Sequence, residues 1–101
     1  MIIYNVTCNV PKLLADEWLQ WLKNEHLPEV LATGKFAEHH LFRLLSQASD
    51  DEGINFIVQY HCADMDEYID YQNNYAPALQ QKTRDKFGDK VVAYRSLMEK
   101  V

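Results

Sequence analysis

Two short patterns in the sequence place a polar ring side chain two residues before a proline. They are formed by Asn24, His26 and Pro28, and by Asn73, Tyr75 and Pro77. An imidazole accepts or donates a proton near neutral pH, which makes His26 a candidate general base. The phenol of Tyr75 is a candidate hydrogen-bond donor to a ligand oxygen. Both rings also have structural interpretations. His26 could hydrogen-bond a backbone carbonyl freed by Pro28, and Tyr75 could be a core residue.

Both prolines fall inside runs with helical spacing. A proline there removes a backbone donor and clashes with the carbonyl four residues earlier, so we expect both helices to bend. The repetition of the pattern indicates a strand-helix-strand unit that occurs twice. Two bent helices that present polar rings favour a pocket at the bends.

Periodicity predicts six elements. Apolar residues alternate from Ile2 to Val10, as in a strand with one buried face. Asp64 and Glu67 have capping-box spacing, and Gly34 and Gly88 are positioned to end helices. The predicted strands are 2–10, 36–45, 54–62 and 91–98, and the predicted helices are 12–33 and 64–87. A polar loop over 46–53 joins the second and third strands into a hairpin.

This order predicts an α+β, ferredoxin-like βαββαβ fold over residues 1–101 as one domain. The first and third strands are expected to be central in a four-stranded antiparallel sheet, with both helices on one face. The face predicted to lie under the helices carries Tyr4, Val6, Cys8, Phe56, Val58 and Tyr60. The opposite face carries Asn5, Thr7, Asn9, Asn55, Ile57, Gln59 and His61.

The opposite face is built from short, neutral hydrogen-bonding side chains. A solvated face is expected to use more Lys, Glu and Arg, so we expect this one to be covered by a second copy, giving a homodimer. A plain solvated face is the alternative. If the dimer encloses a polar interior, the candidate ligand-binding residues on this face are Asn5, Thr7, Gln59 and His61.

Aromatic and arginine side chains add further ligand-binding candidates. Trp18, Trp21 and Tyr71 could line an aromatic pocket, although packing against the sheet is the more common use. Arg43 and Arg95 suit an anionic ligand if they point into the covered face, and surface ion pairs if they do not. The register of the second strand is ambiguous, so the directions of Arg43, His39 and His40 stay open.

The histidines and cysteines do not form a familiar metal or disulfide pattern. His39 and His40 are adjacent in a strand and point to opposite faces, so at most one could join His26 and His61, and no obvious carboxylate or thiolate accompanies them. We therefore expect no metal and no cofactor. The two cysteines should lie at opposite ends of the sheet, separated by roughly 20 Å, as unpaired core residues.

Composition excludes several classes of partner. The 101 residues carry a net charge of −5 with a pI near 5.2, which argues against nucleic acid and anionic membrane as partners. The first ten residues lack a basic n-region and a long apolar core, so the sequence predicts a cytoplasmic protein.

Four segments resemble one protein family. They are residues 1–7, residues 18–30 ending in His26-Leu27-Pro28-Glu29-Val30, Phe42-Arg43-Leu44-Leu45, and Val91-Val92-Ala93-Tyr94-Arg95. Together they resemble short bacterial proteins classed as a domain of unknown function. The resemblance implies a dimeric α/β barrel, a group that includes antibiotic-biosynthesis monooxygenases, muconolactone isomerases and haem-degrading enzymes. The haem-degrading relatives use a histidine on the second helix, and this chain has none there.

Two leading functions remain open at this point, with metal or haem binding as a third possibility that metal analysis and an absorption spectrum would test. The first is a homodimeric barrel that binds a small molecule, either without catalysis or as a cofactor-independent, monooxygenase- or isomerase-like enzyme with His26 as base. The second is a non-catalytic module for dimerisation, metabolite sensing or protein interaction. A cavity beside His26 would favour the first, and a sealed interface the second.

Overall fold

Four antiparallel strands form one sheet in the order β2-β3-β1-β4. The strands are β1 (Ile2–Val10), β2 (Phe36–Arg43), β3 (Ile54–Cys62) and β4 (Val92–Glu99). The computed structural model describes residues 1–46 and 53–101, so most of the predicted 46–53 loop lies outside the described residues. The prediction that the first and third strands are central is confirmed, and both of these strands have the predicted bounds.

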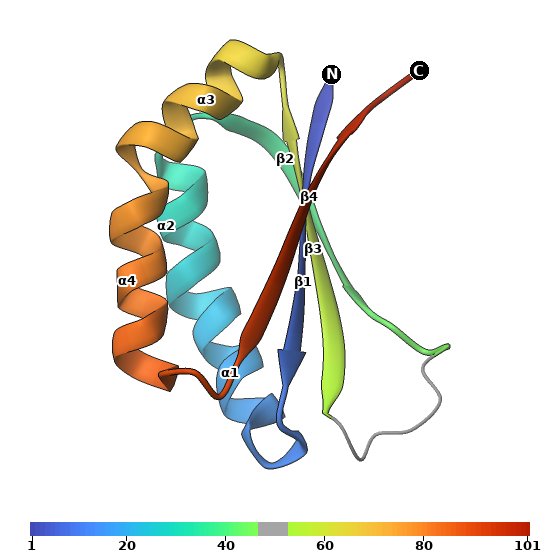
Figure 1. Ribbon diagram of the computed structural model, residues 1–101, viewed down its shortest axis with the longest axis vertical. Coiled ribbons are helices and arrows are strands. Elements are labelled where there is room, and N and C mark those ends of the chain that lie inside the picture. The colour runs from blue at the N-terminus through green and yellow to red at the C-terminus, as the bar shows by residue number, and fades with distance from the viewer. Residues whose placement is uncertain (47–52) are drawn as a thin grey trace.

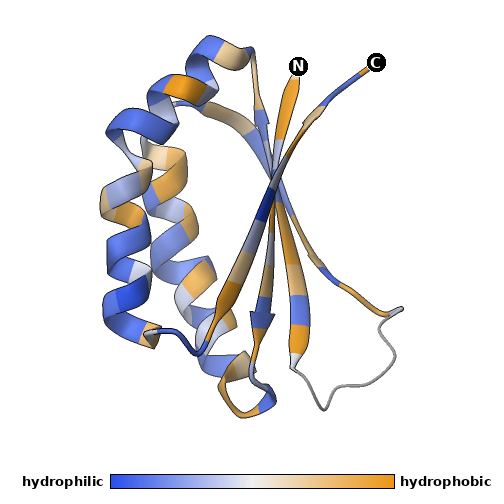
Figure 2. Ribbon diagram, in the orientation of Figure 1, coloured by the Kyte–Doolittle hydropathy of each residue, from blue (hydrophilic) through white to orange (hydrophobic). Residues whose placement is uncertain are grey.

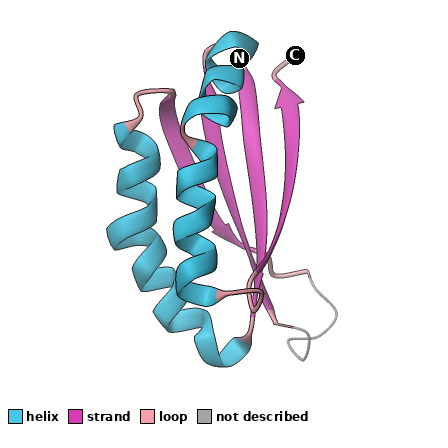
Figure 3. Ribbon diagram, turned by 60° about the vertical axis from the view of Figure 1, so that its left-hand side comes forward, coloured by secondary structure: helices cyan, strands magenta, loops and turns pink. Residues whose placement is uncertain are grey.

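The helices lie together on one face of this sheet (Figures 1 and 3). The first helical run consists of η1 (Lys12–Leu14), α1 (Ala15–Trp21), η2 (Leu22–His26) and α2 (Leu27–Ala32). The second consists of α3 (Met65–Asn74) and α4 (Ala76–Phe87). The α+β, ferredoxin-like prediction is therefore confirmed. No helix among the described residues is long and apolar enough to cross a membrane.

Both helical runs are interrupted just before their prolines, as predicted, but in different ways. Ahead of Pro28 the helix widens into the π-helical segment η2, in which the Leu27 N–H donates to the Leu22 carbonyl. Ahead of Pro77 the helix breaks at Tyr75, whose φ is −122°. A π turn is a frequent feature of functional sites, because it changes the direction of one side chain without ending the helix.

The helix ends follow the predicted signals. The Asp64 side chain accepts a hydrogen bond of 2.9 Å from the Glu67 N–H and caps α3. Gly88 ends α4 with a φ of 61°, a left-handed conformation that glycine adopts without strain.

The core lies between the sheet and the helices. Figure 2 shows alternating hydropathy along the strands and largely polar outer surfaces on the helices. Tyr4 of β1 pairs with Tyr60 of β3, and both rings are buried under the helix layer. Cys8 and Cys62 are also buried and free, and the register separates them by six residue pairs along the strands. The predicted apolar face is confirmed.

The structure resolves the register of the edge strand β2. An irregularity between Phe36 and Glu38 shifts the pairing by one residue, so that Glu38 pairs with His61 and His40 with Gln59. Glu38 and His40 therefore share the open face with His61, and His39 points to the helix side. A β-bulge of this kind reverses the side-chain alternation beyond it, and the sequence carries no glycine there to announce it.

Candidate functional site

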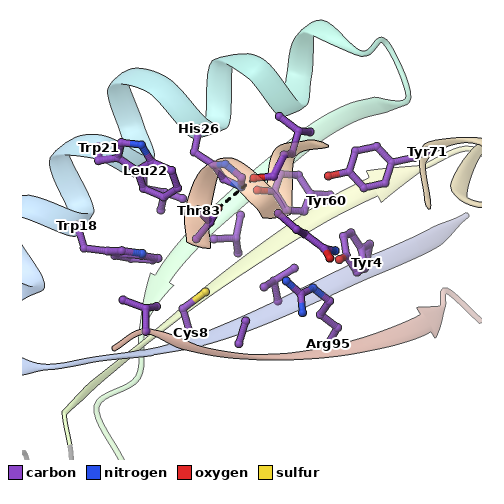
Figure 4. Close-up of a pocket in the computed structure, with 16 residues that line it drawn as sticks. Tyr4, Cys8, Trp18, Trp21, Leu22, His26, Tyr60, Tyr71, Thr83 and Arg95 are labelled. Carbon is purple, nitrogen blue, oxygen red and sulfur yellow. Dashed lines mark hydrogen bonds between the residues drawn. The ribbon is translucent and has the colours of Figure 1, made fainter. Parts of the chain in front are cut away.

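A cavity of about 70 Å³ lies between the helix layer and the sheet, next to β4 (Figure 4). Aromatic, aliphatic and polar side chains from α1, η2, α3 and α4, and from the strands β1, β3 and β4, converge on it. Its lining residues include Tyr4, Cys8, Trp18, Trp21, His26, Tyr60, Tyr71, Thr83, Ala93 and Arg95.

His26 is the titratable ring that the helix layer contributes to this cavity. It is the last residue of the π-helical segment η2 and stacks on Trp21, with ring centroids 4.9 Å apart. Burial lowers the pKa of His26, Arg95 adds to this effect, and the Glu29 carboxylate opposes it. Within the described part of the chain, no hydrogen bond occupies either ring nitrogen of His26. A neutral imidazole with free nitrogens is what a general base requires.

Arg95 is the cation of the cavity, and it comes from the opposite wall. It pairs with Val6 in the β1–β4 register, which turns it toward the helices and under the buried tyrosines (Figure 4). Among the residues that the structure describes, no carboxylate lies within 4 Å of its guanidinium. A guanidinium without a carboxylate partner, at the edge of a cavity, suits an anionic ligand group.

Buried phenols surround the space between His26 and Arg95. The Tyr4 ring lies 5.9 Å from Tyr60, 5.2 Å from Tyr68 and 6.0 Å from Tyr71, measured between centroids. Burial raises the pKa of all four hydroxyls, and the charge of Arg95 partly offsets the rise for Tyr4. The phenols therefore stay protonated at neutral pH. Tyr4, Tyr60 and Tyr71 line the cavity and can donate hydrogen bonds to a ligand oxygen, whereas the Tyr68 hydroxyl donates to Gln72.

Two further buried groups shape the chemistry of the cavity. Trp18 is only 1% exposed, and its indole N–H meets no acceptor among the residues that the structure describes. An unpaired buried donor is unfavourable, so this N–H favours a ligand with an acceptor atom. Burial raises the pKa of the Cys8 thiol to about 11, so this cysteine stays a neutral thiol and is no nucleophile at neutral pH.

A second, outer cleft of about 440 Å³ shares two residues with the inner cavity. Trp21 and His26 line both spaces, so their stacked rings form the partition between them. Charged side chains line the rest of the cleft: Glu25, Glu29, Lys82, Asp85 and Lys86. Glu29 and Lys82 form an ion pair of 2.9 Å across the two helical runs.

The structure divides the predicted site residues into two groups. His26, Trp21, Tyr71 and Arg95 meet at the inner cavity. Asn5, Thr7, Gln59 and His61 lie on the opposite, open face of the sheet, where Asn5 donates to Thr7. Within one chain the sheet lies between the two groups, so they face different spaces.

Two predicted residues lie outside both groups. Tyr75 stands at the helix break, 37% exposed, and stacks on Tyr71 at 6.5 Å without lining the inner cavity. Arg43 pairs with Phe56 at the end of edge strand β2 and is exposed.

Sequence reasoning missed the phenols of Tyr4 and Tyr60 as possible ligand contacts, and it named Trp18 only as a ring that could line a pocket, not as a hydrogen-bond donor. It placed the tyrosines correctly in the core, where alternation along the strands put them. The signal that was available is the number of tyrosines on the buried face, since each buried hydroxyl needs a partner.

Comparison with known structures gives the same architecture throughout. An ethyl tert-butyl ether D (EthD) family protein from Bacillus halodurans matches over 100% of both chains, with a TM-score of 0.74 and 11% identity. A protein proposed to be an antibiotic biosynthesis monooxygenase from Deinococcus radiodurans matches 100% of this chain and 93% of its own, with a TM-score of 0.68 and 15% identity. At these identities the likeness shows the fold alone.

One further structure and one curated protein sequence are also similar to this chain. A variant of MhuD, with two manganese protoporphyrin IX molecules bound per active site, matches 100% of this chain and 95% of its own, with a TM-score of 0.71 and 17% identity. Regulator of G-protein signaling 22 from Mus musculus is 36% identical over 55 residues, which is 54% of this chain and 4% of that protein. This chain thus corresponds to a very small part of the mouse protein.

The family resemblance expected from the sequence is confirmed over the full length of the chain. The sequence model that matches describes a domain of unknown function, DUF4286, and it covers residues 1–101. The ferredoxin-like fold with two interrupted helices is the structure of this domain. The chain belongs to the DUF4286 family.

Proposed function

We propose that this protein binds a small aromatic or unsaturated compound that carries an anionic or carbonyl oxygen, in the cavity between helices and sheet. One observation carries the proposal: a cation, a buried unpaired donor and a neutral imidazole share this cavity. They are Arg95, Trp18 and His26. Among the described residues no carboxylate pairs with Arg95 and no acceptor meets the Trp18 N–H, so a ligand oxygen would complete the site.

The same arrangement supports proton transfer. His26 would take a proton from a phenol or from a carbon next to a carbonyl group. Arg95, at the exposed edge of the cavity, and the buried tyrosines would stabilise the negative oxygen that results, and the buried phenols contribute most because donors aimed at a developing charge act strongly in a low-dielectric site. Proton abstraction is the first step shared by isomerase-like and cofactor-independent monooxygenase-like reactions, which is the enzyme class we propose.

The size of the two spaces suggests how a ligand would lie. Pockets for metabolite-sized ligands usually measure roughly 300 to 1,000 Å³. The inner cavity, at about 70 Å³, admits only the reacting end of such a ligand. The rest would occupy the outer cleft of about 440 Å³, with Trp21 and His26 at the boundary.

A ligand titration tests this proposal. The probe is 4-hydroxybenzoate, which offers a carboxylate to Arg95 and a phenol to His26. Arg95→Met should weaken binding about 10- to 100-fold, because a hydrogen bond to a charged group contributes about 1.5–3 kcal/mol. Arg43→Met is the matched control, since Arg43 lies outside the cavity and should leave the affinity within twofold. Equal effects of the two variants would mean that the ligand binds elsewhere.

A second variant separates binding from catalysis. His26→Gln keeps a polar side chain of similar size but cannot act as a base. An enzyme should lose turnover of its substrate while retaining much of the affinity for 4-hydroxybenzoate. If the cellular function of the His26→Gln variant is intact, the protein is a sensing module and not an enzyme.

We also propose that the working form is a cytoplasmic homodimer joined through the open face of the sheet. On this face the central amides are flanked by apolar side chains from the two edge strands, including Phe42 (48% exposed) and Tyr94 (65% exposed). An apolar rim of this kind favours an interface. The two free, buried thiols fit a reducing compartment.

Analytical ultracentrifugation tests the dimer. Tyr94→Glu places a charge in the proposed interface and should give a monomer at micromolar concentration. Ile69→Glu is the control, because Ile69 is also exposed, at 47%, but lies on α3 in the helix layer. A wild-type monomer, or a Tyr94→Glu dimer, would exclude this interface.

A further inference from the structure

Two histidines and a glutamate meet on the open face of the sheet, away from the cavity described above. Glu38 and His40 stand two residues apart on β2, and His61 is the residue opposite Glu38 on β3. The β-bulge after Phe36 creates this meeting, because it turns Glu38 and His40 to the same face as His61. Among the described residues, one potential ligand atom from each of the three lies within 4.8 Å of the others.

The distances show a cluster centred on the carboxylate. His40 Nε2 lies 2.8 Å from Glu38 Oε2, and His61 Nδ1 lies 3.8 Å from Glu38 Oε1. The two imidazole rings meet edge to face, with centroids 5.2 Å apart. Both imidazoles thus face the same carboxylate from different strands.

His61 is the least satisfied member of the cluster. Its side chain is only 16% exposed, and neither ring nitrogen has a hydrogen-bond partner within residues 1–46 and 53–101. Buried ring nitrogens without partners are unfavourable, because an imidazole that leaves water loses the hydrogen bonds it made there. A ligand that bonds to one nitrogen would restore that interaction.

We propose that Glu38, His40 and His61 form a binding site for a divalent transition-metal ion of the zinc type. Two imidazoles and one carboxylate are a ligand set that Zn²⁺ accepts, with a fourth position left for water or another group. Ligand atoms bound to one tetrahedral zinc ion lie roughly 3.3 Å apart, given metal–ligand distances of about 2.0–2.1 Å. Glu38 and His40 are exposed enough to close the remaining gap by side-chain rotation, while His61 is held by the sheet.

The competing interpretation is a carboxylate that only shares protons with two imidazoles. The two interpretations differ in which group would bond to the unpartnered ring nitrogens of His61. In the observed arrangement Glu38 is already bonded to His40 at 2.8 Å and lies 3.8 Å from His61 Nδ1, so proton sharing as it stands leaves His61 without a hydrogen bond. A metal ion lying between the three side chains reaches all of them at once.

A metal titration of the purified, chelator-treated protein tests the site. Isothermal titration with Zn²⁺ should give one ion per chain, and Co²⁺ should produce the visible absorption of a four-coordinate ion. His61→Ala and His40→Ala should each weaken Zn²⁺ binding at least about tenfold, and Glu38→Gln should also weaken it, since each removes a ligand. Acidification should release the metal, because both imidazoles must be neutral to bind it.

His39→Ala is the matched control. His39 is adjacent to His40 and exposed, but it points to the other face of the sheet. Its variant should retain the stoichiometry and the Zn²⁺ affinity within twofold. Equal loss in the His39→Ala and His40→Ala variants would indicate adventitious binding by surface histidines and overturn the proposal.

Two other outcomes also decide the matter. A wild-type protein that takes up no Zn²⁺ at 100 µM contradicts the site directly. If His61→Ala does not fold, as judged by circular dichroism, the exposed His40 and Glu38 variants carry the test. In that case, Zn²⁺ should raise the melting temperature of wild type but not of the His40→Ala variant, because only a protein that binds the ion is stabilised by it.

Discussion

Filling the inner cavity should make the protein more stable and less able to bind a ligand. Ala93 lies half-buried on β4 and lines the cavity of about 70 Å³. Ala93→Val adds two methyl groups to that space. At about 0.8 kcal/mol for each buried group, the free energy of unfolding should rise by at most about 1.6 kcal/mol. The higher strand propensity of valine acts in the same direction.

Urea denaturation at a fixed protein concentration measures this change. With a typical slope of about 2 kcal/mol per molar urea, the midpoint should rise by up to about 0.8 M. The affinity for 4-hydroxybenzoate should fall in the same variant, because the added methyl groups occupy the part of the cavity that the reacting end of the ligand would fill. Ala37→Val is the control, since it adds the same groups at an exposed position of β2 and should shift stability by less than about 0.5 kcal/mol.

The opposite result would refute the reasoning. A loss of more than about 1 kcal/mol in Ala93→Val would mean that the site is already filled and that the added methyl groups are forced against their neighbours. Unchanged affinity for the probe would mean that the ligand does not enter this cavity.

Three further changes have defined outcomes. Wild type should lose stability as the pH falls from 7 through the ordinary imidazole range near 6.5, and the His26→Gln variant should lose less. Burial lowers the pKa of His26 in the folded protein, so the unfolded chain binds the proton more readily. Urea unfolding at a series of pH values measures the difference. Gly53→Ala should lower the free energy of unfolding by more than about 2 kcal/mol in urea unfolding, because φ at Gly53 is 103° and the new Cβ would lie 2.8 Å from Asn9 Oδ1 and from a backbone carbonyl oxygen. Gly34→Ala is the control. It has open space around the new Cβ and should cost about 1 kcal/mol. Trp18→Phe should destabilise by less than about 1.5 kcal/mol in the same assay, well below the usual 3–5 kcal/mol for truncating a buried tryptophan, because the change also removes an unpaired donor.

The central strands could be predicted to the residue because their faces differ so clearly. Along β1 and β3, the residues under the helices are apolar or aromatic, while those opposite are polar apart from Ile3 and Ile57, and a shift of one residue would exchange the two sets. The edge strands lack this contrast. In β4, Tyr94 and Met98 on one face are as bulky as Leu97 and Arg95 on the other, so alternation alone did not decide which way Arg95 points.

The candidate site could be predicted only in part, because it depends on contacts between distant segments. His26 was identifiable from its own chemistry and its place before Pro28. The convergence of Tyr4, Tyr71 and Arg95 beside it requires the register of three strands and the packing of two helical runs. The cluster on the open face was missed for a related reason, since one β-bulge decides that His40 and not His39 joins His61.

The π-helical segment η2 bears on how such a site can be gained or lost by changes of chain length. In an α-helix, one inserted residue rotates everything beyond it by about 100° and would move the apolar stripe off the sheet. A π turn accommodates one extra residue within a single wide turn, so the segments on either side keep their faces. Deletion of one residue between Leu22 and His26 would therefore restore a regular α-helical turn and reposition the imidazole, while leaving the packing of α1 and α2 on the sheet nearly intact. Within such a fold, the presence of the base can change between related sequences by a length difference of one residue in this turn.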